Sequence, residues 1–220
     1  MSKINISIDC VVFGFDNDNK LKVLLIKQVG DAAQFALPGD LLGEKEELDI
    51  ASSRILKSLT SLDNLYMRQF HVFGNPERVS FTKDRKWLIT NRKHPEERVI
   101  TIGYFALVKM ENYNPKPSSF AFSVKWVDIH QIPELAFDHN MIIEKALLHL
   151  KDKINYEITS ELLPEKFTLT QLQLLYEVIL NQKLDKRNFR KSIERKGVIK
   201  ATKEKQIGVA HKRAEFYKFI

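Results

Sequence analysis

The sequence predicts an α+β fold in two parts: a mixed sheet with helices, then a small helical domain that ends in two short strands. Three observations support this prediction. Apolar residues alternate at the start of the chain, apolar residues recur every three or four positions in later segments, and the excess positive charge is concentrated near the end. The predicted parts are residues 1–152 and 153–220.

The first part opens with a predicted hairpin. The segment 4–12 alternates as a strand does, 16–19 (DNDN) is a polar turn, and 22–28 (KVLLIKQ) is the partner strand. A helix is expected from Glu46 onward, because apolar residues share one helical face there: Leu48, Ala51, Ile55, Leu59 and Leu62. Further strands are expected at 66–73, 99–108 and 123–127, and a further helix at 139–150.

From residue 155 the pattern becomes helical. Thr168 or Thr170 is expected to cap a long helix, and a second helix is expected from 184–185 to Arg195, with Gly197 at its end. Short strands are expected at 198–199 and 214–219, joined by a basic hairpin at 202–213. Two helices followed by such a hairpin are the arrangement of a winged helix-turn-helix.

The charge distribution points to a polyanionic partner. Residues 185–220 contain 12 of the 35 basic residues but only 4 of the 28 acidic ones, so the rest of the chain is nearly neutral. The single cysteine, Cys10, excludes an intrachain disulfide and a cysteine-based zinc site. Apolar runs fall far short of the roughly 18 residues that span a bilayer, so a cytoplasmic protein without membrane contact is expected.

The segment that follows the first hairpin resembles a degenerate Nudix box. Leu37, Pro38 and Gly39 stand between a strand and a helix, with Glu46 and Arg54 at the family's spacing. Several defining positions are replaced: Asp40 stands for a glycine, Ile55, Ser58 and Leu59 for glutamates, and Ser61 for the final glycine. The resemblance implies a Nudix-like α/β/α sandwich with a mixed sheet, in which Gly39, Glu46 and Arg54 are structural remnants.

These replacements argue against the chemistry of the family. Nudix hydrolysis uses magnesium, which prefers carboxylate and water oxygens, and the family supplies glutamates from this helix. Ile55 and Leu59 offer no oxygen, and Ser58 offers an uncharged one. We therefore predict no catalytic residues, no metal site and no cofactor. Arg54 is expected to hold the loop onto the helix through Glu46 or loop carbonyls.

The C-terminal part resembles the DNA-binding domain of Nudix-related transcriptional regulators, which include NAD-metabolism repressors and the arabinose-responsive regulators of the Bacteroidetes type. The segments 184–191 (LDKRNFRK) and 210–217 (AHKRAEFY) carry the resemblance. It implies a homodimer that binds double-stranded operator DNA. The expected DNA contacts lie at the start of the second helix and at the wing: Lys186, Arg187, Asn188, Arg190, Lys191, His211, Lys212 and Arg213.

Within this family the altered Nudix box favours L-arabinose as the effector, because a neutral pentose needs neither magnesium nor a pyrophosphate clamp. The predicted effector contacts are Asp9, Lys27, Gln28, Phe35 and Asp40. Asp9 stands out because a carboxylate within an apolar strand must find a partner. His71 and His139 are expected to be structural. The basic insertion 75–98 could cover the effector site, lie at a dimer interface or contact phosphate, and the sequence leaves these open.

The predicted function is a ligand-responsive regulator of carbohydrate metabolism, whose sugar effector shifts the dimer away from the arrangement that binds DNA. Three alternatives remain: a regulator that senses ADP-ribose, an active Nudix hydrolase of nucleoside diphosphate derivatives with a nucleic-acid-binding appendage, and a nucleic-acid-binding structural protein without an effector. Magnesium-dependent turnover or binding of one of the two effectors would separate them.

Overall fold

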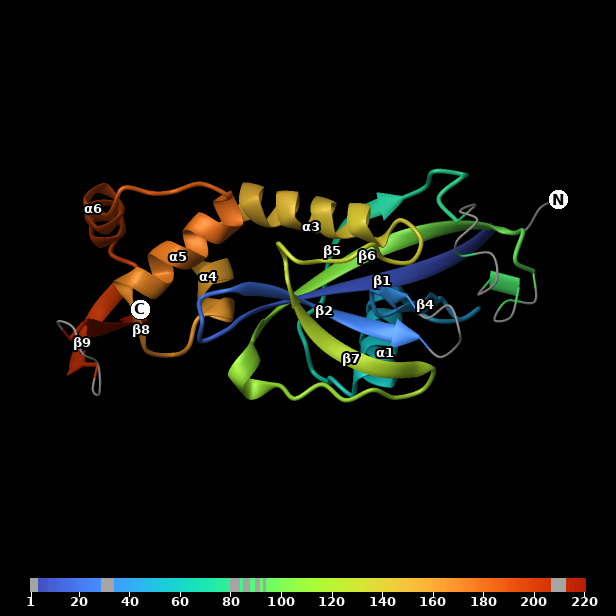
Figure 1. Ribbon diagram of the computed structural model, residues 1–220, viewed down its shortest axis with the longest axis horizontal. Coiled ribbons are helices and arrows are strands. Elements are labelled where there is room, and N and C mark those ends of the chain that lie inside the picture. Colours follow the sequence, from blue (N-terminus) through green and yellow to red (C-terminus); the bar gives the residue numbers. More distant parts are fainter. Residues whose placement is uncertain are drawn as a thin grey trace.

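The computed structural model describes residues 4–28, 34–79, 84, 88–89, 92, 94–206 and 213–220. Figure 1 shows an elongated molecule, with the large sheet and its helices in one part and the winged helix at the far end. Among the described residues, no helix is both long enough and apolar enough to cross a membrane.

The large sheet is mixed, as predicted. Its central path runs β3–β2–β1–β6–β5, with β4 paired to β1 and β7 to β2. β1 and β6 are parallel and the remaining pairs are antiparallel. The strands are β1 (Ile4–Phe15), β2 (Leu21–Gln28), β3 (Phe35–Ala36), β4 (Gly39–Leu41), β5 (Arg68–Phe73), β6 (Arg98–Lys109) and β7 (Ala121–Asp128).

Strand β1 lies inside the sheet and is buried on both faces from Ser7 to Phe15. Its odd-numbered apolar residues, including Val11 and Phe13, belong to one hydrophobic cluster, while Ile8 and Cys10 belong to another. Adjacent side chains of a strand point to opposite faces, so one strand supplies both layers of the core. Burial raises the pKa of the Cys10 thiol above its ordinary range.

Helices cover both faces of this sheet. α1 (Leu48–Thr60) packs Ala51, Ile55 and Leu59 against one face. On the other face lie α3 (His139–Lys153) and the short helix α4 (Tyr156–Leu162), which the sequence pattern did not reveal. A single 3₁₀ turn, η2 (Met110–Asn112), follows β6. This arrangement is the predicted α/β/α sandwich.

The last part is a winged helix. It contains β8 (Phe167–Thr168), α5 (Leu169–Leu180), α6 (Lys186–Lys196), β9 (Ile199–Lys205) and β10 (Glu215–Phe219). Thr168 caps α5 in a capping box with Gln171, and Gly197 ends α6 at φ 64°, where a glycine is favoured. β8 was not predicted; it completes a three-stranded sheet of order β8–β10–β9.

The hydrophobic core continues from the sheet into the winged helix. Phe13, Ile142 and Leu150 belong to the same cluster as Leu172 and Phe189. An ion pair also crosses the junction, because Arg68 of β5 donates to both carboxylate oxygens of Glu161 in α4, at 3.0 and 2.5 Å. The predicted boundary between residues 152 and 153 falls in the last turn of α3 and stays a prediction.

Candidate effector pocket and DNA-binding face

A pocket of about 310 Å³ opens where β1, β4, the start of α3 and parts of the basic insertion meet. Two adjacent strands and a helix start position the pocket walls, and Arg78, Val79 and Arg92 of the insertion add to them. Its lining residues are Ser7, Asp9, Leu37, Gly39, Asp40, Leu41, Arg78, Val79, Arg92, Phe120, Phe137 and His139.

Arg78 is the buried centre of this pocket, with only 4% of its surface exposed. Its guanidinium donates to both oxygens of Asp138, at 2.6 and 2.9 Å, and also to the hydroxyl of Thr101. The Asp9 carboxylate lies 3.8 Å away. A buried arginine is tolerated when its donors are matched in this way, and Arg78 therefore ties the insertion to β1, β6 and the start of α3.

Asp9 finds the partners that its apolar strand required. Its Oδ2 lies 3.5 Å from Nε2 of His139, while Nδ1 of His139 accepts a hydrogen bond from the Leu37 amide at 3.0 Å. Burial raises the pKa of Asp9 to about 6, although the positive charges of Arg78 and Arg92 oppose this rise. The carboxylate is thus ionised at neutral pH and responds to mild acid. The structural role expected of His139 agrees with these contacts.

Arg92 supplies a second cation to the pocket. Its Nη1 is buried and has no hydrogen-bond partner among the described residues. Burial is also the main cause that lowers the pKa of its guanidinium. An unmatched buried donor costs free energy, and the simplest use of such a group is to bind an acceptor that the protein does not supply. The pocket lining thus combines two guanidinium groups, those of Arg78 and Arg92, with the carboxylates of Asp9 and Asp40.

The structure brings together two of the five predicted effector residues. Asp9 and Asp40 line the pocket, whereas Lys27 and Phe35 do not; they face each other in the β2–β3 pair, and Phe35 packs against the core. The side chain of Gln28 lies outside the described residues. Arg78 and Arg92 were not predicted as effector contacts, although the basic composition of the insertion 75–98 was a usable signal for them. His139, which was expected to be structural, also lines the pocket.

The Asp9 side chain requires a glycine at position 39. The two residues are directly paired between β4 and β1. A Cβ at position 39 would overlap the Asp9 carboxylate and would also approach the Ile8 carbonyl oxygen to 3.2 Å. Only glycine leaves room for the buried acid, so this remnant of the Nudix box now shapes the pocket floor.

We expect Gly39→Ala to lower the free energy of unfolding by about 1–3 kcal/mol, because the added methyl group overpacks a site with no slack. Urea denaturation measures the difference. Gly74→Ala is the matched control, since a Cβ at Gly74 would meet no atom within 4 Å. Equal stability of the two variants would show that the Asp9 side chain can move aside.

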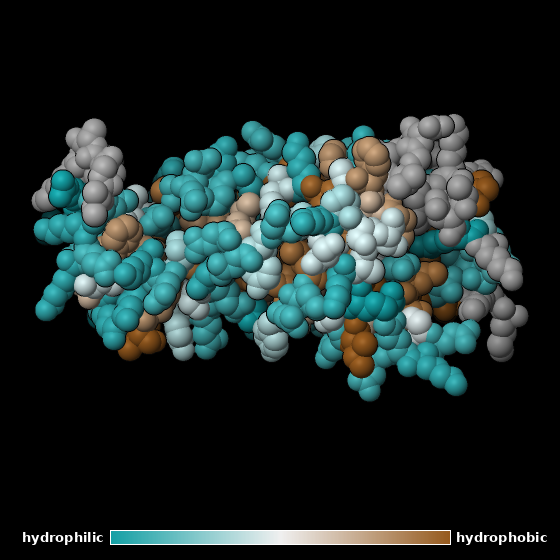
Figure 2. All heavy atoms as spheres, turned by 90° about the horizontal axis from the view of Figure 1, so that it is seen from below, coloured by the Kyte–Doolittle hydropathy of each residue, from teal (hydrophilic) through white to brown (hydrophobic). Residues whose placement is uncertain are grey.

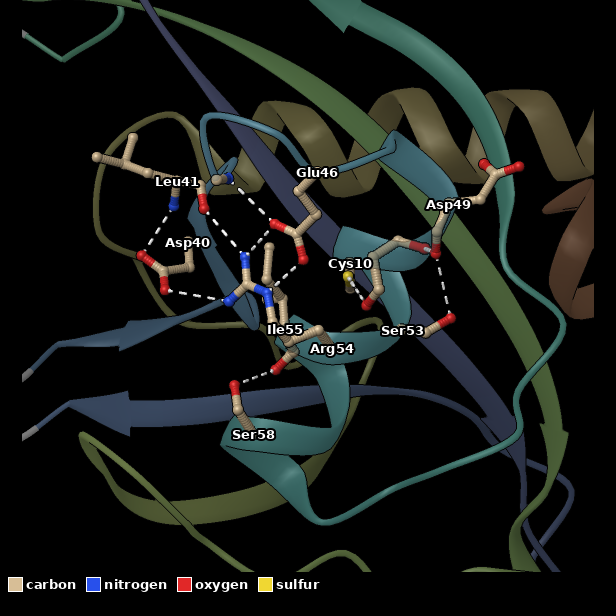
Figure 3. A network of polar contacts seen from close by, with 11 residues as sticks. Cys10, Asp40, Leu41, Glu46, Asp49, Ser53, Arg54, Ile55 and Ser58 are labelled. Carbon is tan, nitrogen blue, oxygen red and sulfur yellow. Dashed lines mark hydrogen bonds and ion pairs between the residues drawn. The ribbon is translucent and has the colours of Figure 1, made fainter.

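The remaining Nudix-box residues form a salt-bridged bracket at the start of α1 (Figure 3). Arg54 donates to both oxygens of Glu46, at 2.6 and 2.8 Å, and to the carbonyl of Leu41 at 3.2 Å. The Gly43 amide donates to Glu46 as well, and the contact with Arg54 lowers the pKa of that carboxyl. The bracket holds the loop onto the helix in the way the sequence suggested.

This helix does not fit a magnesium site of the Nudix kind. Ile55 and Leu59 are fully buried carbon side chains, and the Ser58 hydroxyl donates to the Ile55 carbonyl. Both oxygens of Glu46 are already committed to Arg54. In the part of the chain that the structure describes, no group of three or more histidine, cysteine or acidic side chains is arranged to hold a metal.

The helix α6 carries the predicted DNA contacts on one exposed side. Lys186, Arg187, Asn188 and Lys191 are exposed and Arg190 is half-buried, while Phe189 and Ile193 anchor the opposite side in the core. In Figure 2 hydrophilic side chains predominate over the winged-helix end of the face shown. Arg213 is exposed at the base of the wing. The other two predicted wing residues, His211 and Lys212, lie outside the described residues.

Glu177 fixes the turn that presents α6. Its carboxylate accepts hydrogen bonds from the Leu184 amide at 3.0 Å and from Gln173 at 2.9 Å, and it pairs with Lys183 at 3.1 Å. Asp185 then caps α6 by accepting from the Asn188 amide at 2.8 Å. The start of α6, where the basic residues gather, is therefore held rigidly against α5.

Comparison with known proteins agrees with this architecture. Residues 159–219 match the NrtR DNA-binding winged helix domain. A relative described as the ADPR responsive transcriptional repressor NtrR of Acinetobacter baylyi is 31% identical over 221 residues, which cover 97% of this chain and 81% of the relative. The arabinose-responsive branch that the sequence favoured gains no support from this relative.

Two solved structures of Shewanella oneidensis NrtR extend the likeness. NrtR complexed with a 27mer DNA is 25% identical, with a TM-score of 0.71 over 98% of this chain and 93% of the other. Its NUDIX domain complexed with ADP ribose is 26% identical, with a TM-score of 0.54 over 68% of this chain and 90% of that one. A Nudix-like domain is thus joined to a winged helix, and the chain belongs to the NrtR-type family of DNA-binding transcriptional regulators.

Proposed function

We propose that the pocket binds ADP-ribose or a close nucleoside-diphosphate sugar, and that this effector controls binding of the winged helix to operator DNA. The observation that carries the proposal is the buried, unmatched Nη1 of Arg92, a residue that lines the pocket together with Arg78. A diphosphate offers the charged acceptor oxygens that such a donor needs. The relative from Acinetobacter baylyi, described as ADPR responsive, supports the same ligand class.

L-arabinose fits these observations less well. A neutral pentose offers hydroxyl oxygens to Arg92 but no anionic charge, and a hydrogen bond between two charged groups is about twice as strong as one between neutral groups. Loss of the glutamates does not by itself exclude a diphosphate ligand, because arginines can bind a diphosphate without a metal. We therefore replace the sugar, and with it the link to carbohydrate metabolism, by the nucleotide ligand.

We further propose that the protein does not hydrolyse its effector, because α1 offers carbon side chains at Ile55 and Leu59 in place of magnesium ligands. The regulator is proposed to act as a homodimer, since paired half-sites need paired reading helices. For each protomer the proposed DNA contacts are Lys186, Arg187, Asn188, Arg190, Lys191, His211, Lys212 and Arg213. The exposed amide and guanidinium groups suit base edges, and the lysines suit phosphates.

Calorimetry with ADP-ribose and with L-arabinose tests the effector. We expect heat from ADP-ribose, and we expect Arg92→Gln to weaken its binding at least about tenfold, because a hydrogen bond to a charged partner is lost. Lys27→Gln, outside the pocket, is the matched control and should bind as the unmodified protein does. Heat from L-arabinose alone would overturn the ligand class. Release of products from ADP-ribose in the presence of magnesium would overturn the non-catalytic role.

A further inference from the structure

A groove of about 780 Å³ separates the winged helix from the turn that joins β1 to β2. The first turn of α5, the α6 residues Lys186 and Arg190 and both strands of the wing form most of its lining. Asn17 and Asn19, from the β1–β2 turn of the Nudix-like domain, complete the lining. Figure 1 shows this turn reaching from the large sheet toward the winged helix. The Nudix-like domain, called the sensor domain below, therefore contributes one wall of a groove that begins on α6, the helix with the proposed DNA contacts.

The groove is cationic. Lys186, Arg190, Lys205 and Arg213 line it, and among the lining residues that the structure describes only Glu215 carries a carboxylate. The start of α5 adds the partial positive charge of a helix N-terminus. Such a surface attracts a polyanion, and in a DNA-binding protein the polyanion at hand is the phosphate backbone next to the bases that α6 reads.

Two side-chain atoms in this groove lack partners. Across the described residues only three buried side-chain nitrogen or oxygen atoms make no hydrogen bond, and two of them, Oδ1 of Asn19 and Nε of Arg190, belong to residues of this groove. Nε of Arg190 is a donor, so a phosphate oxygen could complete it, and an unmatched buried donor is costly. Oδ1 of Asn19 is an acceptor, which a phosphate cannot complete, so only the Nδ2 group of Asn19 could donate to a phosphate.

Hydrogen bonds within the β1–β2 turn fix the backbone that carries the side chains of Asn17 and Asn19. Asn19 adopts the left-handed conformation at φ 60°, and its backbone amide donates to the Asp16 carbonyl oxygen at 3.1 Å. The Asp16 carboxylate accepts from the Lys20 amide at 2.9 Å and pairs with Lys22 at 2.6 Å, so its charge is neutralised locally. Asp18 is exposed and is not among the residues that line the groove.

We propose that this turn is part of the DNA interface: the phosphate backbone of the operator enters the groove, where Asn17 and Asn19 donate to phosphate oxygens beside Lys186 and Arg190. The sensor domain then touches DNA directly, in addition to steering the winged helix. This inference rests on DNA binding by the winged helix and is independent of the effector's identity.

Fluorescence anisotropy with an operator duplex selected from a random library tests the turn. Asn19→Asp and Asn17→Asp place a negative charge against the backbone and are expected to weaken binding about tenfold each. Asn64→Asp is the control: Asn64 is also a loop asparagine in the left-handed conformation, at φ 57°, but unlike the half-buried Asn19 it is exposed and lies outside the groove. It should bind DNA within about twofold of the unmodified protein.

A tethered cleavage reagent gives a second, independent readout. Cys10 is buried and will not react, so Asn17→Cys can be labelled alone with iron–EDTA, and it should cut the operator backbone near the bases protected by α6. The same label on Asn64→Cys should not. Unchanged affinity of both aspartate variants together with no cleavage from position 17 would overturn the proposal. If Arg187→Ala also bound normally, the error would lie instead in the proposed DNA face.

Discussion

Replacing Arg78 with methionine is expected to lower the free energy of unfolding by about 3–5 kcal/mol at pH 7.5, because one partner of a buried ion-pair network is removed. Arg78 donates to both oxygens of Asp138 and lies 3.8 Å from the Asp9 carboxylate. Without it, the buried acids Asp9 and Asp138 both lose their contact with this guanidinium. Methionine keeps the volume of the side chain, so the measured loss reports charge and hydrogen bonding more than a cavity.

The loss should shrink in mild acid. The pKa of Asp9 is about 6 in the folded protein against an ordinary value of 3.8, and removal of Arg78 raises it further. A carboxyl with a raised pKa stabilises the fold while protonated, and that stability is lost as the pH rises through the folded pKa. Urea denaturation at pH 5 should therefore show a smaller difference between Arg78→Met and the unmodified protein than denaturation at pH 7.5.

Arg68→Met provides the comparison. Arg68 also makes a bidentate contact with a carboxylate, that of Glu161, but these two side chains are 30% and 29% exposed. Water can hydrate the Glu161 carboxylate once Arg68 is removed. Arg68→Met should therefore lower the free energy of unfolding by no more than about 1 kcal/mol, and this loss should depend little on pH. Similar losses in the two variants would mean that burial does not set the strength of the pocket network.

Most of the fold could be predicted because its elements carry local signals. The turn at 16–19, the capping threonine Thr168 and the terminal Gly197 each specify a backbone geometry with a few neighbouring residues. β8 and α4 escaped prediction for the same reason: a two-residue strand exists only through its pairing with β10, and α4 (YEITSEL) is too short for a periodic pattern to be distinguished from chance.

The pocket was predictable only in part because its chemistry is assembled from distant segments. Asp9 could be identified from the sequence as an acid in an apolar strand. Its partners, Arg78 and His139, lie at least 69 residues further along the chain. Nothing local in the insertion 75–98 says that Arg78 turns inward and is almost fully buried. The preference for arabinose, which the comparisons do not support, could not take these arginines into account, because Arg78 and Arg92 come together with Asp9 only in the folded chain.

Arg187→Ala is expected to reduce affinity for the operator duplex by tenfold to about a hundredfold, as the loss of one base-reading arginine typically does. Arg187 is exposed in the first turn of α6, on a helix that Glu177 and Asp185 hold in place. Alanine favours the helix, so the fold should be unaffected. Anisotropy titrations over a range of salt concentrations measure both the affinity and the number of phosphate contacts.

The salt dependence separates the two roles open to this side chain. If Arg187 reads a base, the slope of log K against log salt stays near that of the unmodified protein, and discrimination between operator and random DNA falls. If it contacts phosphate, the slope decreases by about one and all sequences lose affinity alike. Lys145→Ala, an equally exposed cation on α3, is the control and should change neither quantity. Unchanged affinity in Arg187→Ala would remove the start of α6 from the DNA interface and shift the reading role to the wing.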